Sequence, residues 1–455
     1  MNSLPKNILV VGLGKSGQSA SLFLVSLGRQ VTAVDDREKT SFGEELISLQ
    51  NISVKMQFGK DKNIDVKNFD VVIISPGIPL THPIIVAAKK LNIPVIGELE
   101  LASRHFAGKI IAITGTNGKT TTTTLLGEML QKAKTPVCVG GNIGIPMIDL
   151  ITKATEGFTA VIETSSFQLD TIDTFHANVA ILLNITDDHQ DRYSNFEAYT
   201  GSKGKIFNRQ TQKDIAIYNA DDAHVYRVAM KSDARKWPFT WKKENLSANQ
   251  EGALLTKDAI MVQTQKTGLI QFPATKIQLK GSHNMENVAA AILGALSQNV
   301  STDDILKTLH SFKGLPHRMT FVGTIDGVQF YDDSKATNTD AVKRALSCFD
   351  KPVILILGGK DKDSDFAVLI PEIQNHVKEL ILTGEAATII QKVIKGVVPT
   401  RILPLFEDAV KTAFSTAEKG DVVLLSPACA SFDAFTSYAH RGDVFQQIVK
   451  TLKRP

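Results

Sequence analysis

Short apolar runs alternate with segments of helical period along most of the chain. Runs interleaved with helices in this way are typical of buried parallel strands in βαβ units. They form three series, at residues 8–12, 31–35, 71–75 and 93–97, at 110–115, 160–165 and 179–185, and at 352–359, 379–384 and 421–428. The pattern therefore predicts three successive α/β units.

The segment from about residue 235 to 280 departs from this pattern. Its stretch "GLIQFPATKIQLKG" alternates weakly between apolar and polar positions, which indicates antiparallel strands at a sheet edge. Further on, "FKGLPHRM" places glycine and proline together after a helix-like segment, a signal for a boundary. We therefore expect domains at 1–98, 99–314 and 315–455, the middle one with a small antiparallel β insert.

A glycine turn in "AITGTNGKTTTTTLL" joins a strand to a helix that starts near Lys119. Backbone N–H groups at such a helix start suit phosphate oxygens. Gly115 and Gly118 would let the backbone approach closely, Lys119 would neutralise the phosphates, and the Thr120 hydroxyl could bind Mg²⁺. The usual phosphate loop has a glycine where Ile113 stands, and an ordinary β–α turn remains the alternative.

Acidic and histidine side chains follow two further runs. Glu163 in "ETSSFQL" and Asp188 and His189 in "NITDDHQDRY" each lie at or just past a predicted strand end. Ligands of open α/β sheets gather beyond the carboxyl ends of strands. Each residue alone is more often a surface or structural residue, but their shared placement favours a site around Mg²⁺ and the γ-phosphate.

The last unit also has polar groups after three of its strands. Asp333, Lys335 and Thr337 crowd a turn in "YDDSKATNTDA", and "GGKDKDSDF" and "SPACASFDAF" follow two other runs. Capped helix starts explain some of these residues, because Ser, Thr and Asp are favoured caps. The remainder indicate a third group of binding residues.

The N-terminal "VGLGKSGQSA" fits G-x-G-x-x-G through Gly12, Gly14 and Gly17. Asp35 ends the next strand, near where a ribose-binding acid belongs. On its own this motif suggests a nicotinamide-dependent dehydrogenase. That hypothesis leaves "GTNGKTT" unexplained.

Composition narrows the class of protein. The 455 residues are 43% hydrophobic with a net charge of +4, and no dense Lys/Arg run argues for a nucleic-acid partner. The N-terminus has one lysine before a short apolar run that meets a glycine turn, which indicates a first strand rather than a signal peptide. Three dispersed cysteines without a CxxC pair favour a reducing compartment. We expect a cytoplasmic protein, monomeric and without a membrane partner.

Taken together, these motifs resemble the Mur ligase family, ATP-dependent amide-forming enzymes of bacterial cell-wall synthesis, to which folylpolyglutamate synthetase is related. The family's phosphate loop is typically G-T-N-G-K-[ST], so the missing glycine is the family's own form. Further segments that carry the resemblance span nearly the whole chain: "SPGI", "GNIG", "ETSSFQL", "DDHQDRY", "GSHNMEN", "LPHR", "DDSKATN", "LGGKDKDSDF" and "SPACASFDAF". They are most similar to the D-glutamate-adding branch, and the D-N-P-[RK] motif of the diaminopimelate- or lysine-adding branch is not found in the sequence.

The resemblance implies three domains: a Rossmann-like one for the UDP-sugar substrate, a P-loop ATPase-like one for ATP and metal, and a Rossmann-like one for the amino acid. It implies the ATP-dependent addition of D-glutamate to UDP-N-acetylmuramoyl-L-alanine through an acyl phosphate, in peptidoglycan precursor synthesis. Another amino-acid ligase of the family, or a non-catalytic nucleotide-binding module, are the other hypotheses.

The resemblance also implies roles for single residues. Expected in substrate binding are Lys15, Ser16, Asp36, Arg37, Ser75, Gly77, Asn142, His189, Thr337, Lys362, Ser431 and Tyr438. Expected in ATP binding are Gly115, Thr116, Asn117, Gly118, Lys119, Thr120, Thr121, Asn284, Asn287, Arg318 and Asp333. Lys119, His189, Lys203 and Lys335 would be catalytic, and Thr120, Glu163, His189 and Lys203 would hold metal. Relatives vary at the position of Lys15, and a phenylalanine is common at that of Tyr438.

Lys203 in "GSKGKIF" aligns with the family's carbamylated lysine. A lysine must be neutral to capture CO₂, which requires a depressed pKa from burial or nearby cations. The carbamate would then bind a second Mg²⁺. From the residues alone, Lys203 would be a surface lysine.

Overall fold

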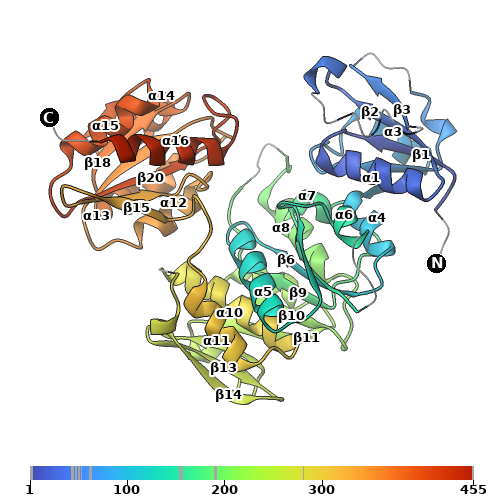
Figure 1. The fold of residues 1–455 in the computed structure, drawn as a ribbon, viewed down its shortest axis with the longest axis horizontal. Coiled ribbons are helices and arrows are strands. Elements are labelled where there is room, and N and C mark those ends of the chain that lie inside the picture. Colours follow the sequence, from blue (N-terminus) through green and yellow to red (C-terminus); the bar gives the residue numbers. More distant parts are fainter. Residues whose placement is uncertain are drawn as a thin grey trace. The chain divides into compact units, whose positions relative to one another are not determined.

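The computed structural model describes residues 4–42, 46, 49, 52, 54–60, 64–152, 157–188, 192–279 and 281–452. The chain forms two compact units: unit 1 comprises residues 1–185, 197–274 and 286–308, and unit 2 comprises 186–196, 275–285 and 309–455. Two sheets belong to unit 1 and one to unit 2 (Figure 1). In the described part of the chain, no helix has the length and apolar character needed to cross a bilayer.

The first sheet of unit 1 has five parallel strands in the order β3-β2-β1-β4-β5. They are β1 (Asn7–Val11), β2 (Gln30–Asp35), β3 (Val54–Phe58), β4 (Val71–Ile74) and β5 (Val95–Gly97), with helices α1 (Lys15–Ser26) and α3 (Pro83–Lys90) between them. The four predicted strands are confirmed. β3 was not predicted, because this edge strand is at most half-buried and lacks an apolar run.

The second sheet of unit 1 has nine strands in the order β14-β13-β12-β11-β10-β9-β6-β8-β7. They are β6 (Lys109–Thr114), β7 (Val137–Gly141), β8 (Thr159–Glu163), β9 (Val179–Leu182), β10 (Ile215–Asn219), β11 (Arg235–Thr240), β12 (Gly252–Leu255), β13 (Ala259–Thr264) and β14 (Gly268–Pro273). Its helices are α5 (Lys119–Lys132), α6 (Met147–Ile151), α7 (Ser166–Leu169), α8 (Phe196–Gly204), α9 (Ala223–Ala229), α10 (Ser282–Ser297) and α11 (Thr302–Ser311). The predicted strands β6, β8 and β9 and the helix start at Lys119 are confirmed.

The antiparallel prediction for residues 235–280 holds only in part. β12, β13 and β14 are antiparallel neighbours at the sheet edge, whereas β11 runs parallel to β10. The difference follows from the connections, since helix α9 crosses between β10 and β11 but short turns join β12 to β13 and β13 to β14. The antiparallel strands extend the main sheet and do not form a separate insert.

The third sheet, in unit 2, has the order β15-β16-β20-β17-β18-β19, parallel except for β15. Its strands are β15 (Thr320–Ile325), β16 (Val328–Asp332), β17 (Val353–Gly358), β18 (Val377–Thr383), β19 (Thr400–Ile402) and β20 (Val422–Ala428). Helices α12 (Thr339–Leu346), α13 (Ile370–His376) and α14 (Ala387–Ile394) pack on one face, and α15 (Phe406–Thr416) and α16 (Tyr438–Thr451) on the other. The three predicted strands of this series are confirmed.

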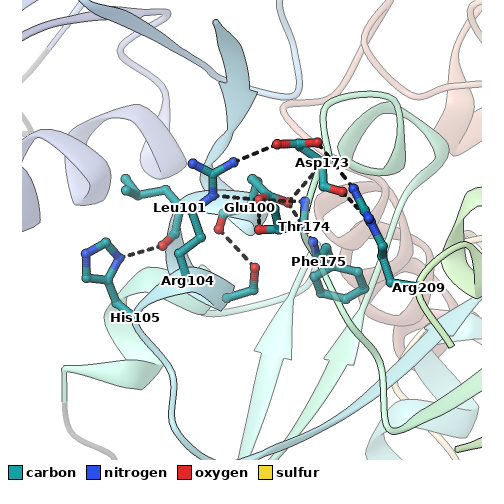
Figure 2. Close-up of polar contacts among 9 residues, drawn as sticks. Glu100, Leu101, Arg104, His105, Asp173, Thr174, Phe175 and Arg209 are labelled. Atoms are coloured by element: carbon teal, nitrogen blue, oxygen red, sulfur yellow. Dashed lines mark hydrogen bonds and ion pairs between the residues drawn. The ribbon is translucent and has the colours of Figure 1, made fainter. Parts of the chain in front are cut away.

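Helix α4 (Glu98–Arg104) joins the two sheets of unit 1, directly after β5. Figure 2 shows its buried Glu100, whose carboxylate accepts hydrogen bonds from the backbone N–H groups of Asp173 (2.8 Å) and Phe175 (2.9 Å) and from Arg104 Nε (2.7 Å). Burial raises the pKa of Glu100, but these hydrogen bonds outweigh it and leave the pKa below its usual 4.5. Glu100 thus ties α4 to the segment between α7 and β9.

Glu98 fixes the same helix on another side. Its Oε1 accepts a hydrogen bond from the backbone N–H of Ile148 in α6 at 2.6 Å. Its Oε2 is buried and has no hydrogen-bond partner among the described residues. Burial therefore raises the pKa of Glu98 from 4.5 to about 7. The expected boundaries near Leu99, inside α4, and near Gly314, between α11 and β15, stay predictions.

Candidate nucleotide and substrate site

The loop between β6 and α5 has a backbone that requires its glycines. Gly115 and Gly118 have φ values of 157° and 84°, and a Cβ on Gly118 would lie 2.1 Å from Oδ1 of Asn287. Lys119 Nζ donates hydrogen bonds to the carbonyls of Gly115 (2.8 Å) and Thr116 (2.7 Å). The loop therefore places a lysine and the N-terminus of a 14-residue helix at one point, which suits an anion.

The carboxyl ends of the neighbouring strands bring two predicted residues together. β8 pairs with both β6 and β7, so that Glu163 lies opposite Ile113 and Gly141. Asn142, which follows β7, donates from Nδ2 to Glu163 Oε1 at 2.9 Å. Glu163 Oε2 is buried and accepts no hydrogen bond from the described residues. A buried carboxylate oxygen without a donor is a ready ligand for a cation.

Asn184, just after β9, holds the loop but was not predicted. Its side chain accepts from the backbone N–H of Asn117 (2.8 Å) and donates to the Asn117 carbonyl (3.1 Å). Its own carbonyl accepts from the N–H of Thr116 at 2.9 Å. The apolar run 179–185 includes Asn184, and only its place at a strand end could have singled it out.

Lys203, on α8, is buried rather than on the surface. Its side chain is 2% exposed, and its Nζ donates to the Gly115 carbonyl at 2.8 Å. The ammonium lies 4.6 Å from the ring centre of Tyr199, and the Tyr199 hydroxyl is 3.2 Å from Oγ1 of Thr116. Lys119 and Lys203 thus share one carbonyl of the loop.

The donors at this edge suit Mg²⁺. Mg²⁺ takes oxygen ligands from one or two carboxylates together with phosphates and water, and Glu163 Oε2 and the Thr120 hydroxyl are of this kind. No group of three His, Cys, Asp or Glu residues within the described ranges could hold a metal ion by itself. His189, the further predicted ligand, lies outside the described residues.

The glycine turn of the first sheet is closely packed. Ser75 donates to the Gly12 carbonyl at 2.7 Å, and a Cβ on Gly17 would lie only 1.8 Å from that carbonyl oxygen. Asp35 accepts from the N–H of Leu13 (2.7 Å) and from Arg37 Nη2 (2.9 Å). Burial raises the pKa of Asp35, but these bonds outweigh it and lower the pKa below 3.8. Asp35 is thus occupied in shaping the turn.

His82 lies beside the predicted substrate residues and was missed. Its Nε2 is 3.2 Å from Asp36 Oδ2, and its Nδ1 accepts from the N–H of Ile84 in α3. Ser16 is the second residue of α1, after the glycine turn, and Gly77 follows β4. Lys15 donates a hydrogen bond to the carbonyl of Gly144 in the loop after β7. Nothing in the pattern of "SPGIPLTHP" separates His82 from a helix cap.

Unit 2 contains a polar pocket of about 240 Å³. It is lined by Thr337 and Lys362, both predicted for the amino acid, and by Asp188. The Asn338 Nδ2 donates to Asp188 Oδ2 at 3.3 Å. The pocket therefore joins a lysine to several hydrogen-bonding groups, as an amino-acid carboxylate requires.

The other predicted residues of unit 2 lie on the loops after β16 and β20, before β15, and in the first turns of α10 and α16. Asp333 accepts from Ser426 Oγ (2.9 Å), and its burial raises its pKa to about 7. Lys335 Nζ lies 3.8 Å from the ring centre of Tyr438. Ser431 is 2% exposed, after β20. The remaining predicted nucleotide residues are Thr121 on α5, Asn284 and Asn287 on α10, and Arg318 before β15.

Three family models match successive parts of the chain. They are the MurD-like N-terminal domain of Mur ligases over residues 6–97, the Mur ligase middle domain over 113–295, and the Mur ligase glutamate ligase domain over 317–429. The chain belongs to the Mur ligase family.

Individual relatives agree with this assignment. The chain is 42% identical to the UDP-N-acetylmuramoylalanine–D-glutamate ligase of Desulfosudis oleivorans, over 98% of this chain and 97% of the relative. It is also 42% identical to the ligase of that name from Acidobacterium capsulatum, over 98% and 96%. The solved pseudomurein peptide ligase type C of Methanothermus fervidus matches with a TM-score of 0.63 at 18% identity, over 99% of this chain and all of that one. The solved structure supports the fold alone.

Proposed function

We propose that this chain adds D-glutamate to UDP-N-acetylmuramoyl-L-alanine at the expense of ATP, in peptidoglycan precursor synthesis. One observation carries the chemical part of the proposal: the loop of residues 115–120, the open oxygen of Glu163 and the buried Lys203 meet at one sheet edge. The relatives' shared name supports the choice of substrates.

In the first step, the alanyl carboxylate of the UDP substrate attacks the γ-phosphate of ATP in line, giving an acyl phosphate and ADP. Lys119 and the loop N–H groups would stabilise the charge on the transferring group, which is the largest task in such a reaction. Asn142, which is bonded to Glu163, would orient the end of the substrate.

In the second step, the D-glutamate amine attacks the acyl carbon, and phosphate leaves. Lys362 and Thr337 line a pocket with the polar groups that a glutamate needs, and Ser431 and Tyr438 would complete its binding. Lys335 would act close to the reacting groups. Holding the reactants near one another supplies much of the rate in a two-step transfer of this kind.

Thr120 and Glu163 would hold Mg²⁺, together with His189. Bound there, the ion would neutralise the phosphate oxygens. We further propose that Lys203 carries a carbamate, whose negative charge would serve a second Mg²⁺. Burial supports this proposal, since it favours the neutral amine that reacts with CO₂.

The proposed contacts to adenine are Asn284 and Asn287. The proposed contacts to the phosphate and ribose are Arg318 and Asp333. For the UDP group they are Lys15, Ser16, Asp36, Arg37, Ser75 and Gly77. A nicotinamide dehydrogenase is the weaker hypothesis. Its ribose would need the Asp35 carboxylate, whose two oxygens already accept hydrogen bonds from Leu13 and Arg37. We also propose a cytoplasmic monomer, and the three free cysteines fit a reducing compartment.

The deciding experiment is ADP release with ATP and the UDP-muramoyl-alanine substrate, with D-glutamate and L-glutamate in parallel reactions. We expect release that depends on D-glutamate and not on L-glutamate. Release that instead requires lysine, diaminopimelate or L-alanine would assign the chain to another branch of the family. No release with any amino acid would contradict the ligase proposal, and binding of NADH would then favour the dehydrogenase.

A further inference from the structure

Arg441 is a buried arginine in unit 2 to which the proposed reaction gives no role. It lies in the first turn of α16 and is 2% exposed. Burial lowers the pKa of its guanidinium to about 10. A buried cation must be fully hydrogen-bonded to be tolerated, so its partners indicate what it holds.

The first partners lie in the loop after β16. Arg441 Nε donates to Ser334 Oγ at 2.9 Å, and Nη2 donates to the Ser334 carbonyl at 2.8 Å. Ser334 in turn donates from Oγ to the Tyr438 carbonyl at 2.8 Å. Ser334 lies next to Lys335 and three residues before Thr337, so this contact fixes the loop that carries both.

The second partners lie in the loop after β20. Arg441 Nη2 donates to the Cys429 carbonyl at 3.1 Å and Nη1 to the Ala430 carbonyl at 3.4 Å. Ala428 has a φ of 61°, an unfavourable value for a residue with a side chain, so this turn needs support. Ser431 follows immediately.

The third loop, after β17, is reached through Ala430. The backbone N–H of Lys360 donates to the Ala430 carbonyl at 2.9 Å, and the N–H of Ala430 donates back at 3.0 Å. A Cβ on Gly359 would lie 3.0 Å from Arg441 Nη1, so the guanidinium also packs on this loop. Lys362 lies two residues beyond Lys360.

We propose that Arg441 is a positioning residue that holds three strand-end loops in register for D-glutamate binding. The proposal rests on the function proposed above, which assigns Lys335 and Thr337, Lys362, and Ser431 to those loops. A guanidinium is suited to the task because its rigid, planar set of donors reaches several carbonyls at once, whereas a lysine ammonium has one charged centre on a flexible stem. Arg441 itself is expected to contact neither D-glutamate nor the UDP substrate.

The test compares Arg441→Lys and Arg441→Ala with wild type in steady-state kinetics. We expect Arg441→Lys to raise the KM for D-glutamate by about tenfold or more, the loss expected for hydrogen bonds from a charged group. The KM for the UDP substrate should not change. In Arg441→Ala, added methylguanidinium should restore part of the D-glutamate affinity and leave the KM for the UDP substrate unchanged, a selectivity that a general loss of structure would not show.

Arg401→Lys is the matched control, because Arg401 lies in the same unit, is 56% exposed and donates from Nε to Glu379 Oε1 at 2.6 Å. It should leave both KM values unchanged. If neither Arg441 variant folds, Ser334→Ala carries the test, since it removes the acceptor of Nε and keeps the arginine; it should raise the same KM by a smaller factor. An unchanged D-glutamate KM in the folded variants overturns the inference alone. Absence of D-glutamate-dependent turnover in wild type overturns the proposed function instead.

Discussion

A buried lysine is the most informative single residue of this protein. Lys203 is 2% exposed and donates to the Gly115 carbonyl, which also accepts from Lys119. Two ammonium groups on one carbonyl repel each other, so a neutral or carbamylated Lys203 removes an unfavourable interaction. The burial of Lys203 beside the phosphate loop is thus the feature on which the proposed carbamate rests.

Lys203→Ala should be nearly inactive, because the proposed second metal ion loses an anionic ligand. Acetate or formate should restore part of the rate by occupying the vacated space. The control is Lys205→Ala, since Lys205 is 37% exposed and pairs with Asp170, and surface substitutions change stability by only about 0.5 kcal/mol. Activity is measured as ADP release, and the intact mass of wild type should show a labile addition of ~44 Da. A fully active Lys203→Ala, or full activity without the added mass, would contradict the carbamate.

At the scale of elements, helix α4 is held by two carboxylates with opposite pKa shifts. Ionisation of Glu100 stabilises the folded state, whereas ionisation of Glu98 destabilises it. For Glu98, the unfolded chain loses its proton near pH 4.5 and the folded chain near pH 7. Its penalty on folding therefore grows as pH rises between those values, up to about 3 kcal/mol above pH 7.

Glu98→Gln should consequently gain stability relative to wild type as pH rises from 5 to 8. Glu100→Gln is the matched comparison on the same helix. Glu100 stabilises the fold at any pH above 4.5, and this contribution disappears only as pH falls through its lowered pKa, so the deficit of Glu100→Gln should be constant from pH 5 to 8. Thermal unfolding of the three proteins across this range measures both effects. A stability difference between Glu98→Gln and wild type that does not change with pH would mean that Glu98 is ionised throughout.

The sequence predicts elements well where burial is two-sided and poorly where it is not. Strands such as β17, which is buried at every position, are apolar runs in the sequence. The half-exposed β3 has no such run. The parallel direction of β11 depends on a crossover helix and not on its own residues. At the site, the loop around Lys119 follows from local chemistry. The roles of Asn184 and His82 depend on contacts with residues distant in the chain, and only the resemblance singled out Lys203.

At the scale of the molecule, the proposed function divides the binding tasks between the two sheets of unit 1. The proposed UDP contacts follow strands of the five-stranded sheet, and the phosphate loop follows β6 of the nine-stranded sheet. A defect in the loop should therefore stop chemistry without preventing the UDP substrate from binding.

Lys119→Ala should lower turnover by roughly 10²–10³ or more, the usual loss for one group that stabilises transition-state charge. Affinity for the UDP substrate, measured by calorimetry, should stay near that of wild type. Lys132→Ala, at the exposed far end of the same helix α5, is the control and should change neither quantity. Near-normal turnover of Lys119→Ala would show that the loop does not serve the chemical step.

The bonding of Asp35 bears on how such glycine turns diverge. The same carboxylate cannot both clamp Leu13 and Arg37 and accept the hydroxyls of a nucleoside ribose, since its oxygens are already spent. For a dinucleotide ribose to bind Asp35, the hydrogen bonds from Leu13 and Arg37 would have to break, and the turn would lose their support. The glycine spacing alone therefore does not decide the ligand of such a turn, and a change of ligand requires a change in the residues that support the turn.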